Sequence, residues 1–411
     1  MARRISHMIK KIRIDQAVPG VYVHDFNCGW LHHPFLVNRF KLSTDKDVEN
    51  ILKYGIRELY IDTEKGLDVE AAPTKQQADS EIQTELDQLS LPTANRGQPS
   101  SLSDEIAKAK KLIGKAKRTT HRLMGDVRLG KQIEMNQVEN IVEQMTESVL
   151  NNKDALISLL RIKTADEYTY THSLAVSALC ISFARHLDYD ADQIRQIGIG
   201  GLLHDIGKMK VPADILNKPG PLTEKEFEIM KAHVKEGERI LRESTNLDEQ
   251  CTCVTVHHHE RMDGTGYPEG LKGDQISVFG QIAAIVDIYD ALSSERCYKG
   301  SMSPHAALRK LLEWSQSYLN RELVEKFIVH VGIYPIGTLV RLKSGYIGVV
   351  IDQGERGLLT PLVRVVFDAI QNRPIEPFVI DLARHRQLAN DDDIVACEGP
   401  EKWHVKPEQY F

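Results

Sequence analysis

The sequence predicts a multidomain protein in which an all-helical bundle carries the functional site, after a small α+β domain and before a β-rich C-terminal segment. The chain has 411 residues, more than one hydrophobic core usually serves, so several folding units are expected. Its apolar pattern changes from short β-type runs to helical spacing and back to short runs. Seven of the 16 histidines fall between positions 172 and 259, which places the candidate site in the helical part.

Five segments follow from these changes in pattern. In chain order they are a small α+β domain at 1–66, an acidic linker at 67–105, a helical connector at 106–163, the helical domain with the site at 164–332, and a β-rich extension at 333–411. Residues 8–63 mix short β-type runs with one helical stretch at 45–54. Residues 64–105 carry nine acids against three bases, and such like charge with low hydrophobicity predicts an extended linker.

The basic stretch at 106–131 has two interpretations. Because it carries nine bases against one acid, the first interpretation is that it binds nucleic acid. The other is favoured, because apolar residues recur there at helical spacing and make the bases the solvated face of an amphipathic helix. A second helix is predicted from Asn136. Both helices are expected to pack on the next domain or on a partner subunit, with a homodimer through residues 106–151.

Helical spacing continues to about Gly332. Thr164 with Glu167, and Thr223 with Glu226, have the spacing of capping boxes, which predicts helix starts before the histidines at 172 and 233. The runs IGTLVRLKSGYIGVVID and TPLVRVVFD beyond position 333 are typical of short strands joined by glycine turns.

Charge, cysteine content and hydropathy exclude other classes of protein. The formal net charge is −6 and the sequence pI is about 6.3, so a globally basic binder of nucleic-acid polymers is not expected. Six cysteines without paired spacing argue against a disulfide framework. The basic amino terminus lacks the apolar core of a signal peptide, and no run reaches the ~18 apolar residues of a membrane span. We therefore expect a cytoplasmic protein without membrane insertion.

The clustered histidines, together with aspartates, suggest metal-dependent phosphate chemistry. Neutral imidazoles and carboxylates that converge on two ions, with one bridging carboxylate, are typical of hydrolytic sites. Helices can each direct one such ligand into the interior of a bundle. The candidates in chain order are His172, His204, Asp205, His233, His258, His259 and Asp287.

Two of these positions have a local sequence context that can be interpreted. Gly207 and Pro212 predict a helix end at the His204–Asp205 pair, where both side chains can face one site. The string that starts at His258 is not the zinc-protease helix motif, because Asp263 stands where that motif needs a histidine.

Three strings in this order resemble the HD-GYP family, bacterial phosphodiesterases of cyclic di-GMP within the HD phosphohydrolase superfamily. They are HDIGK at 204–208, HHERMDGTGYPEGL at 258–271 and VDIYDALSSERCYK at 286–299. The resemblance implies that the helical bundle is of the HD type. The amino-terminal domain is similar to a module found before some HD-GYP domains, a match that implies no chemistry.

Residue by residue, the resemblance implies a binuclear metal site. His172, His204, Asp205 and Asp287 would hold one ion, and Asp205 would bridge to a second ion held by His233, His258 and His259. Family members most often contain iron or manganese. Some members hold a third ion with a glutamate four residues before the first histidine; that position is Tyr168 here, so two divalent ions are expected.

The same resemblance implies roles for residues around the ions. Lys208 would stabilise or protonate the leaving 3′ oxygen, while Arg296 and Lys299 would bind the phosphates of the substrate. Tyr267, in the glycine-rich loop after the paired histidines, would form a stiff exposed contact with substrate and with GGDEF-domain cyclases. The expected products are a linear 5′-phosphorylated dinucleotide and, after a second cleavage, GMP.

Two alternatives stay open from the sequence. One is a cyclic di-GMP receptor with slow or absent hydrolysis, since no residue pattern reports a turnover rate. The other is an HD hydrolase that acts on a linear dinucleotide or on a different cyclic dinucleotide.

Overall fold

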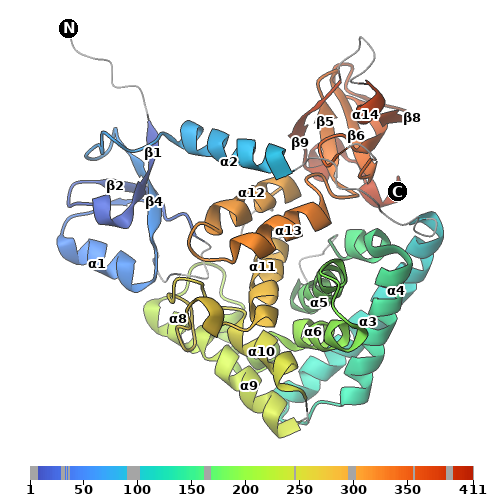
Figure 1. Ribbon diagram of the computed structural model, residues 1–411, viewed down its shortest axis with the longest axis horizontal. Helices are drawn as coiled ribbons and strands as arrows, with labels where there is room; N and C mark the ends of the chain where they lie inside the picture. The colour runs from blue at the N-terminus through green and yellow to red at the C-terminus, as the bar shows by residue number, and fades with distance from the viewer. Residues whose placement is uncertain are drawn as a thin grey trace.

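The computed structural model describes residues 8–28, 33, 35, 38–89, 102–161, 168–244, 247–294, 302–354, 357–385 and 392–410. A small sheet domain, a central mass of helices and a second sheet domain follow one another along the chain, and the helices separate the two sheets (Figure 1). The predicted multidomain fold with a helical centre is therefore confirmed. Within the described ranges, none of the helices is both long and apolar enough to traverse a bilayer.

The N-terminal domain is an antiparallel sheet in the order β1-β4-β2-β3, covered by one helix. Its elements are β1 (Ile9–Arg13), β2 (Tyr22–Asp25), β3 (Phe40–Lys41), α1 (Asp45–Lys53) and β4 (Glu58–Asp62). Thr44 starts α1 through a capping box, because the carboxylate of Asp47 accepts from the Thr44 backbone N–H at 2.8 Å. Ile51 of α1 is fully buried against Leu59 and Ile61 of β4.

The expectation of an extended acidic linker is wrong for part of the segment 67–105. Residues Lys75–Leu89 form helix α2, which packs on α12 (Pro304–Trp314) and α13 (Arg321–Val331) (Figure 1). Two physical reasons explain the difference. Apolar residues spaced by four bury one stripe of the helix, namely Ala78, Ile82 and Leu86. Two of the acids also pair with bases of the helices beneath, Asp79 with Arg309 and Glu85 with Arg321.

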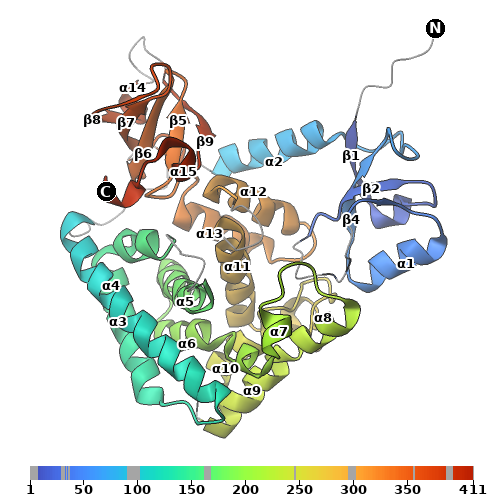
Figure 2. The same ribbon diagram turned by 180° about the vertical axis from the view of Figure 1, so that it is seen from behind.

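Helices α3 (Leu102–Arg128) and α4 (Met135–Arg161) lie side by side along α5 (Tyr168–His186) and α6 (Ala191–Leu203) (Figure 2). Their apolar stripes belong to the same hydrophobic core as the rest of the helical domain, with Met124, Val142 and Met145 almost fully buried. The predicted packing on the next domain is therefore confirmed. A homodimer through 106–151 stays a prediction.

The remaining helices bring the candidate ligands together. They are α5 (Tyr168–His186), α6 (Ala191–Leu203), α7 (Ala213–Leu216), α8 (Glu224–Lys231), α9 (His233–Ser244), α10 (Glu249–His257) and α11 (Val278–Ser293), followed by α12 and α13. The predicted cap at Thr223 starts α8, but that helix ends at Lys231 and a new helix begins at His233. Thr164 and Glu167 lie outside the described residues.

The C-terminal domain is a five-stranded antiparallel sheet in the order β8-β7-β6-β5-β9. Its elements are β5 (Leu339–Leu342), β6 (Tyr346–Asp352), β7 (Leu362–Asp368), β8 (Arg373–Asp381), α14 (Leu382–His385), β9 (Ile394–Cys397) and α15 (Pro400–Trp403). Gln353 joins it to the end of α13, where its amide donates to the carbonyls of Val331 and Tyr334. This confirms the predicted β-rich extension against the helices.

Candidate metal centre

All seven predicted ligands converge in the helical domain, although they come from five separate segments. They are His172 on α5, His204 and Asp205 directly after α6, His233 at the start of α9, His258 and His259 directly after α10, and Asp287 on α11. Most are buried: His204, Asp205 and His233 each expose about 1% of their surface.

Gly207 explains how two of these segments come so close. The sequence suggested that this glycine ends a helix, but α6 already ends at Leu203 and Gly207 lies in the following 3₁₀ turn, Ile206–Lys210. A Cβ atom on Gly207 would stand 1.8 Å from the backbone oxygen of His233. The glycine is therefore required for the close approach of the Asp205 segment to the first turn of α9.

The potential ligand atoms form two groups, and Asp205 of the second group also lies close to the first. One group consists of His172, His204 and Asp287, and the other of Asp205, His233, His258 and His259. Oδ2 of Asp205 faces the first group, 3.2 Å from His204 Nε2 and 3.8 Å from His172 Nε2. Oδ1 faces the second, 3.4 Å from His233 Nε2 and 3.8 Å from His258 Nε2. One carboxylate thus points an oxygen at each group.

Hydrogen bonds fix the orientation of four histidine rings. Each Nδ1 faces an acceptor that has no proton to give, so Nδ1 must carry the proton and Nε2 presents a lone pair to the site. The acceptors are the Asp290 carboxylate for His172 (2.6 Å) and the carbonyls of Gly201 for His204 (2.8 Å), Met230 for His233 (2.6 Å) and Thr255 for His258 (2.8 Å).

Several buried polar atoms at the centre have no hydrogen-bond partner among the described residues. They are Nε2 of His204, His233 and His258, and Oδ1 of Asp205. Unpaired buried polar atoms are costly and rare, so a cluster of them that converges on one point indicates a missing ligand. Imidazole nitrogens and carboxylate oxygens together suit first-row divalent ions, so the donor set fits metal binding.

Burial and local charge set the protonation that a metal requires. Burial lowers the pKa of His233 to about 4 and that of His258 to about 3, so both imidazoles are neutral at pH 7. Burial by itself would raise the pKa of Asp205, but His204 and Lys208 hold it well below its usual range. His233, His258 and Asp205 are therefore in their metal-binding protonation states at neutral pH. At His204 burial lowers the pKa, but the carboxylates of Asp205 and Asp287 raise it above its usual value.

The structure also places two of the predicted substrate or catalytic residues next to the ligands. Lys208 reaches Asp205 Oδ2 with its ammonium at 2.5 Å, and its side chain stays partly exposed. The Tyr267 ring stacks on His259 with centroids 4.7 Å apart, so it is a half-buried cover of a ligand and not the exposed contact that we expected. Arg296 and Lys299 lie outside the described residues.

Two supporting residues escaped the sequence analysis. Asp290 orients His172 and lies one helical turn after Asp287, a spacing that could have indicated a shared face. Glu260 folds the loop after the histidines, because its carboxylate accepts from the backbone N–H groups of Glu269, Gly270 and Leu271. The position of Glu260 directly after the paired histidines was the available signal.

Comparison with known families agrees with this geometry. Residues 136–323 match the model of the HD domain, and residues 9–138 match that of a domain of unknown function, DUF3391. The helical bundle with its His/Asp centre therefore defines a protein of the HD-domain class.

Similar proteins with known names assign the chain to a family within the HD-domain class. A cyclic di-GMP phosphodiesterase of Pseudomonas aeruginosa is 40% identical over 97% of this chain and 94% of its own length. A cyclic di-GMP phosphodiesterase of Thermotoga maritima is 39% identical over 40% of this chain and 45% of its own. A 3′3′-cGAMP-specific phosphodiesterase of Vibrio cholerae is 37% identical over 36% of this chain and 35% of its own. The chain belongs to the HD-GYP family of phosphodiesterases.

Proposed function

We propose that this protein hydrolyses a 3′–5′ phosphodiester bond of cyclic di-GMP to give the linear dinucleotide, which it cleaves further to GMP. The observation that carries the proposal is the carboxylate of Asp205, which points one oxygen at each of two histidine-rich groups. The named activity of the Pseudomonas relative, which matches nearly the whole chain, supplies the substrate.

Two divalent ions, iron or manganese, are proposed as cofactors. His172, His204 and Asp287 would hold one, His233, His258 and His259 the other, and Asp205 both. Bound divalent ions supply Lewis-acid stabilisation of phosphate charge and make water acidic enough to react at neutral pH.

The chain's own residues would complete the reaction. Lys208 would stabilise or protonate the departing 3′ oxygen, a role supported by the position of its ammonium beside Asp205. Tyr267, over His259, would contact the bound dinucleotide. Arg296 and Lys299 are proposed to bind its phosphates, and the loop around Tyr267 to contact GGDEF-domain proteins.

The test is hydrolysis of cyclic di-GMP by the full chain loaded with Mn²⁺ or Fe²⁺, with products separated by chromatography. We expect metal-dependent turnover that His204→Ala and Asp205→Ala abolish. His186→Ala is the matched control, since this histidine belongs to neither ligand group. Wild type with no activity above the two site variants would refute the proposal, and tight nucleotide binding without product would instead establish a receptor.

A second candidate substrate is a different cyclic dinucleotide. The observation in its favour is that the relative named for 3′3′-cGAMP matches this chain at an identity close to that of the Thermotoga protein. Competition between the two nucleotides in one reaction measures the ratio of their kcat/KM values. Cyclic di-GMP should be preferred, and a ratio in favour of 3′3′-cGAMP would reassign the substrate.

A further inference from the structure

Residues 53–57 of the N-terminal domain, which are the last residue of α1 and the turn that joins α1 to β4, contact two segments of the helical domain. One is α8, which leads directly into α9 and His233. The other is the loop 260–271 that follows His258 and His259. Both segments serve the second ligand group, defined as His233, His258 and His259.

The contact with α8 combines polar and apolar groups. The Tyr54 hydroxyl donates to Glu224 Oε1 at 2.5 Å, and Lys53 Nζ pairs with the same oxygen at 3.0 Å. The Tyr54 ring packs edge-on against Phe227 and joins the small core that contains Met230. The carbonyl of Met230 is the acceptor that orients the His233 ring. The turn therefore supports the residue that fixes one ligand of the second group.

The contact with the loop is equally direct. Arg57 Nε donates to Asp263 Oδ2 at 3.2 Å. Gly55, at φ +71°, lies so close to Thr265 that a Cβ on this glycine would stand 2.3 Å from the Thr265 side chain. The same loop also contacts the site. The backbone N–H of Tyr267 donates to the His259 carbonyl at 3.2 Å, and the Tyr267 ring covers the His259 imidazole.

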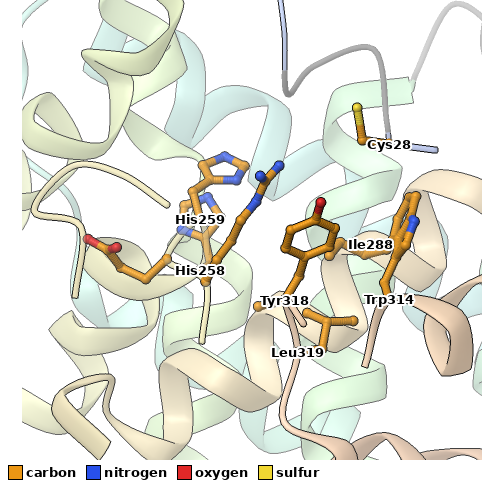
Figure 3. Close-up of a pocket in the computed structure, with 10 residues that line it drawn as sticks. Cys28, His258, His259, Ile288, Trp314, Tyr318 and Leu319 are labelled. Atoms are coloured by element: carbon orange, nitrogen blue, oxygen red, sulfur yellow. The ribbon is translucent and has the colours of Figure 1, made fainter. Parts of the chain in front are cut away.

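A third observation places the N-terminal domain beside the paired histidines. A small pocket is lined by His258 and His259 on one side and by Cys28 of the N-terminal domain on another, with Tyr318 between them (Figure 3). The Tyr318 hydroxyl accepts from the Arg57 backbone N–H at 2.9 Å. The other polar contacts described between the two domains end on α12. The first ligand group is elsewhere, with His172 on α5, His204 directly after α6 and Asp287 on α11.

From these contacts we infer that the N-terminal domain is a positioning element for the second metal ion. Tyr54 and Arg57 fix the position of α8 relative to the loop 260–271. This relative position brings His233, His258 and His259 close to Asp205 Oδ1. This inference rests on the proposed two-metal site. It gives a role in the active site to a domain whose family model carries no function.

The test is metal binding by the full chain, with no activity readout. Metal-free protein is titrated with Mn²⁺ in a calorimeter. The double variant Tyr54→Ala/Arg57→Ala should bind the second equivalent of Mn²⁺ about tenfold more weakly and the first equivalent with unchanged affinity. Tenfold is the lower end of the range for loss of residues that support metal ligands. Tyr54→Phe/Arg57→Lys keeps the ring and the positive charge and should recover most of that affinity.

A matched control changes the same residue types elsewhere in the domain. Tyr22→Ala/Arg13→Ala removes a tyrosine that contacts Lys65 and an arginine that pairs with Asp15, all within the N-terminal domain. This control variant should bind both equivalents of Mn²⁺ with wild-type affinity. Equal loss of both equivalents in Tyr54→Ala/Arg57→Ala, or no change in either, would overturn the inference. Wild type that binds fewer than two equivalents would refute the two-metal site itself, and the inference with it.

Discussion

Two clusters of buried charge in this protein differ in how their polar atoms are satisfied. The first is the metal centre. The second, the Glu313 cluster, lies between the N-terminal domain and α12 and consists of Glu313, Lys11, Lys310, Tyr60 and Asn27. Its central carboxylate pairs with Lys11 at 3.0 Å and Lys310 at 2.9 Å, and accepts from Tyr60 at 3.0 Å and Asn27 at 2.8 Å. These contacts satisfy both carboxylate oxygens within the chain.

The metal centre has the opposite character. Histidine nitrogens and a carboxylate oxygen converge there without partners, although burial makes unpaired polar atoms costly. Burial of charge therefore does not by itself indicate function. Pairing distinguishes the two clusters: the Glu313 cluster is complete as a domain contact, whereas the metal centre requires a ligand from outside the chain.

The largest expected effect comes from Asp205→Asn. The amide keeps the size of the side chain but removes the anionic oxygens that face both ligand groups. We expect at least about a 10³-fold loss of kcat/KM, or ~4 kcal/mol of transition-state stabilisation. Steady-state kinetics at saturating metal measures it, and a loss below tenfold would contradict the bridging role.

Among these variants, Glu313→Gln is expected to lose the most stability against unfolding. It leaves Lys11 and Lys310 without their carboxylate in a buried contact, at a cost of about 3 kcal/mol in the free energy of unfolding. Denaturant unfolding measures the change. Metal binding should persist in the folded variant, and loss of both properties together would show that the two clusters are not independent.

The pH dependence of that stability follows from the pKa of Glu313. Burial would raise this pKa, but Lys310 and Lys11 lower it from 4.5 to about 2 in the folded protein. A lowered carboxyl pKa stabilises the fold above pH 4.5, and the contribution is lost as the pH falls towards 2. The stability difference between wild type and Glu313→Gln should therefore shrink between pH 6 and pH 3, and a difference that grows on acidification would contradict the pairing.

Asp290→Ala tests the support of the first ligand group. His172 would lose the acceptor that orients its ring, so we expect the affinity for the first metal equivalent to fall about 10- to 100-fold. Asp290→Asn should have a smaller effect, because its amide oxygen can still accept from Nδ1. Calorimetric Mn²⁺ titration distinguishes them, and equal effects of the two variants would argue against the hydrogen bond.

The smallest effect is expected at an exposed ion pair. Arg239 on α9 pairs with Glu236 and Glu243 at the surface. Arg239→Ala should leave thermal unfolding and metal binding within experimental error of wild type, because exposed pairs contribute little. A clear loss of metal binding would show that α9 transmits surface changes to His233.

The sequence predicted much of this arrangement and missed what depends on tertiary contact. The three motifs contain five of the seven residues that converge, namely His204, Asp205, His258, His259 and Asp287, whereas His172 and His233 lie outside them and came from the helical pattern and the family resemblance. Helix α2 was missed because acid content was weighed above the apolar spacing of Ala78, Ile82 and Leu86. The contact of Arg57 with Asp263 joins positions 206 residues apart, and no local pattern encodes such a pairing.

The central claim is that Asp205 joins two metal ions in one buried site. Metal content per chain, determined by elemental analysis of wild type and Asp205→Asn after loading with Mn²⁺ and removal of the free ion, tests it directly. We expect two ions per wild-type chain and no more than one in the variant. Fewer than two ions in wild type, or an unchanged count in Asp205→Asn, would contradict it.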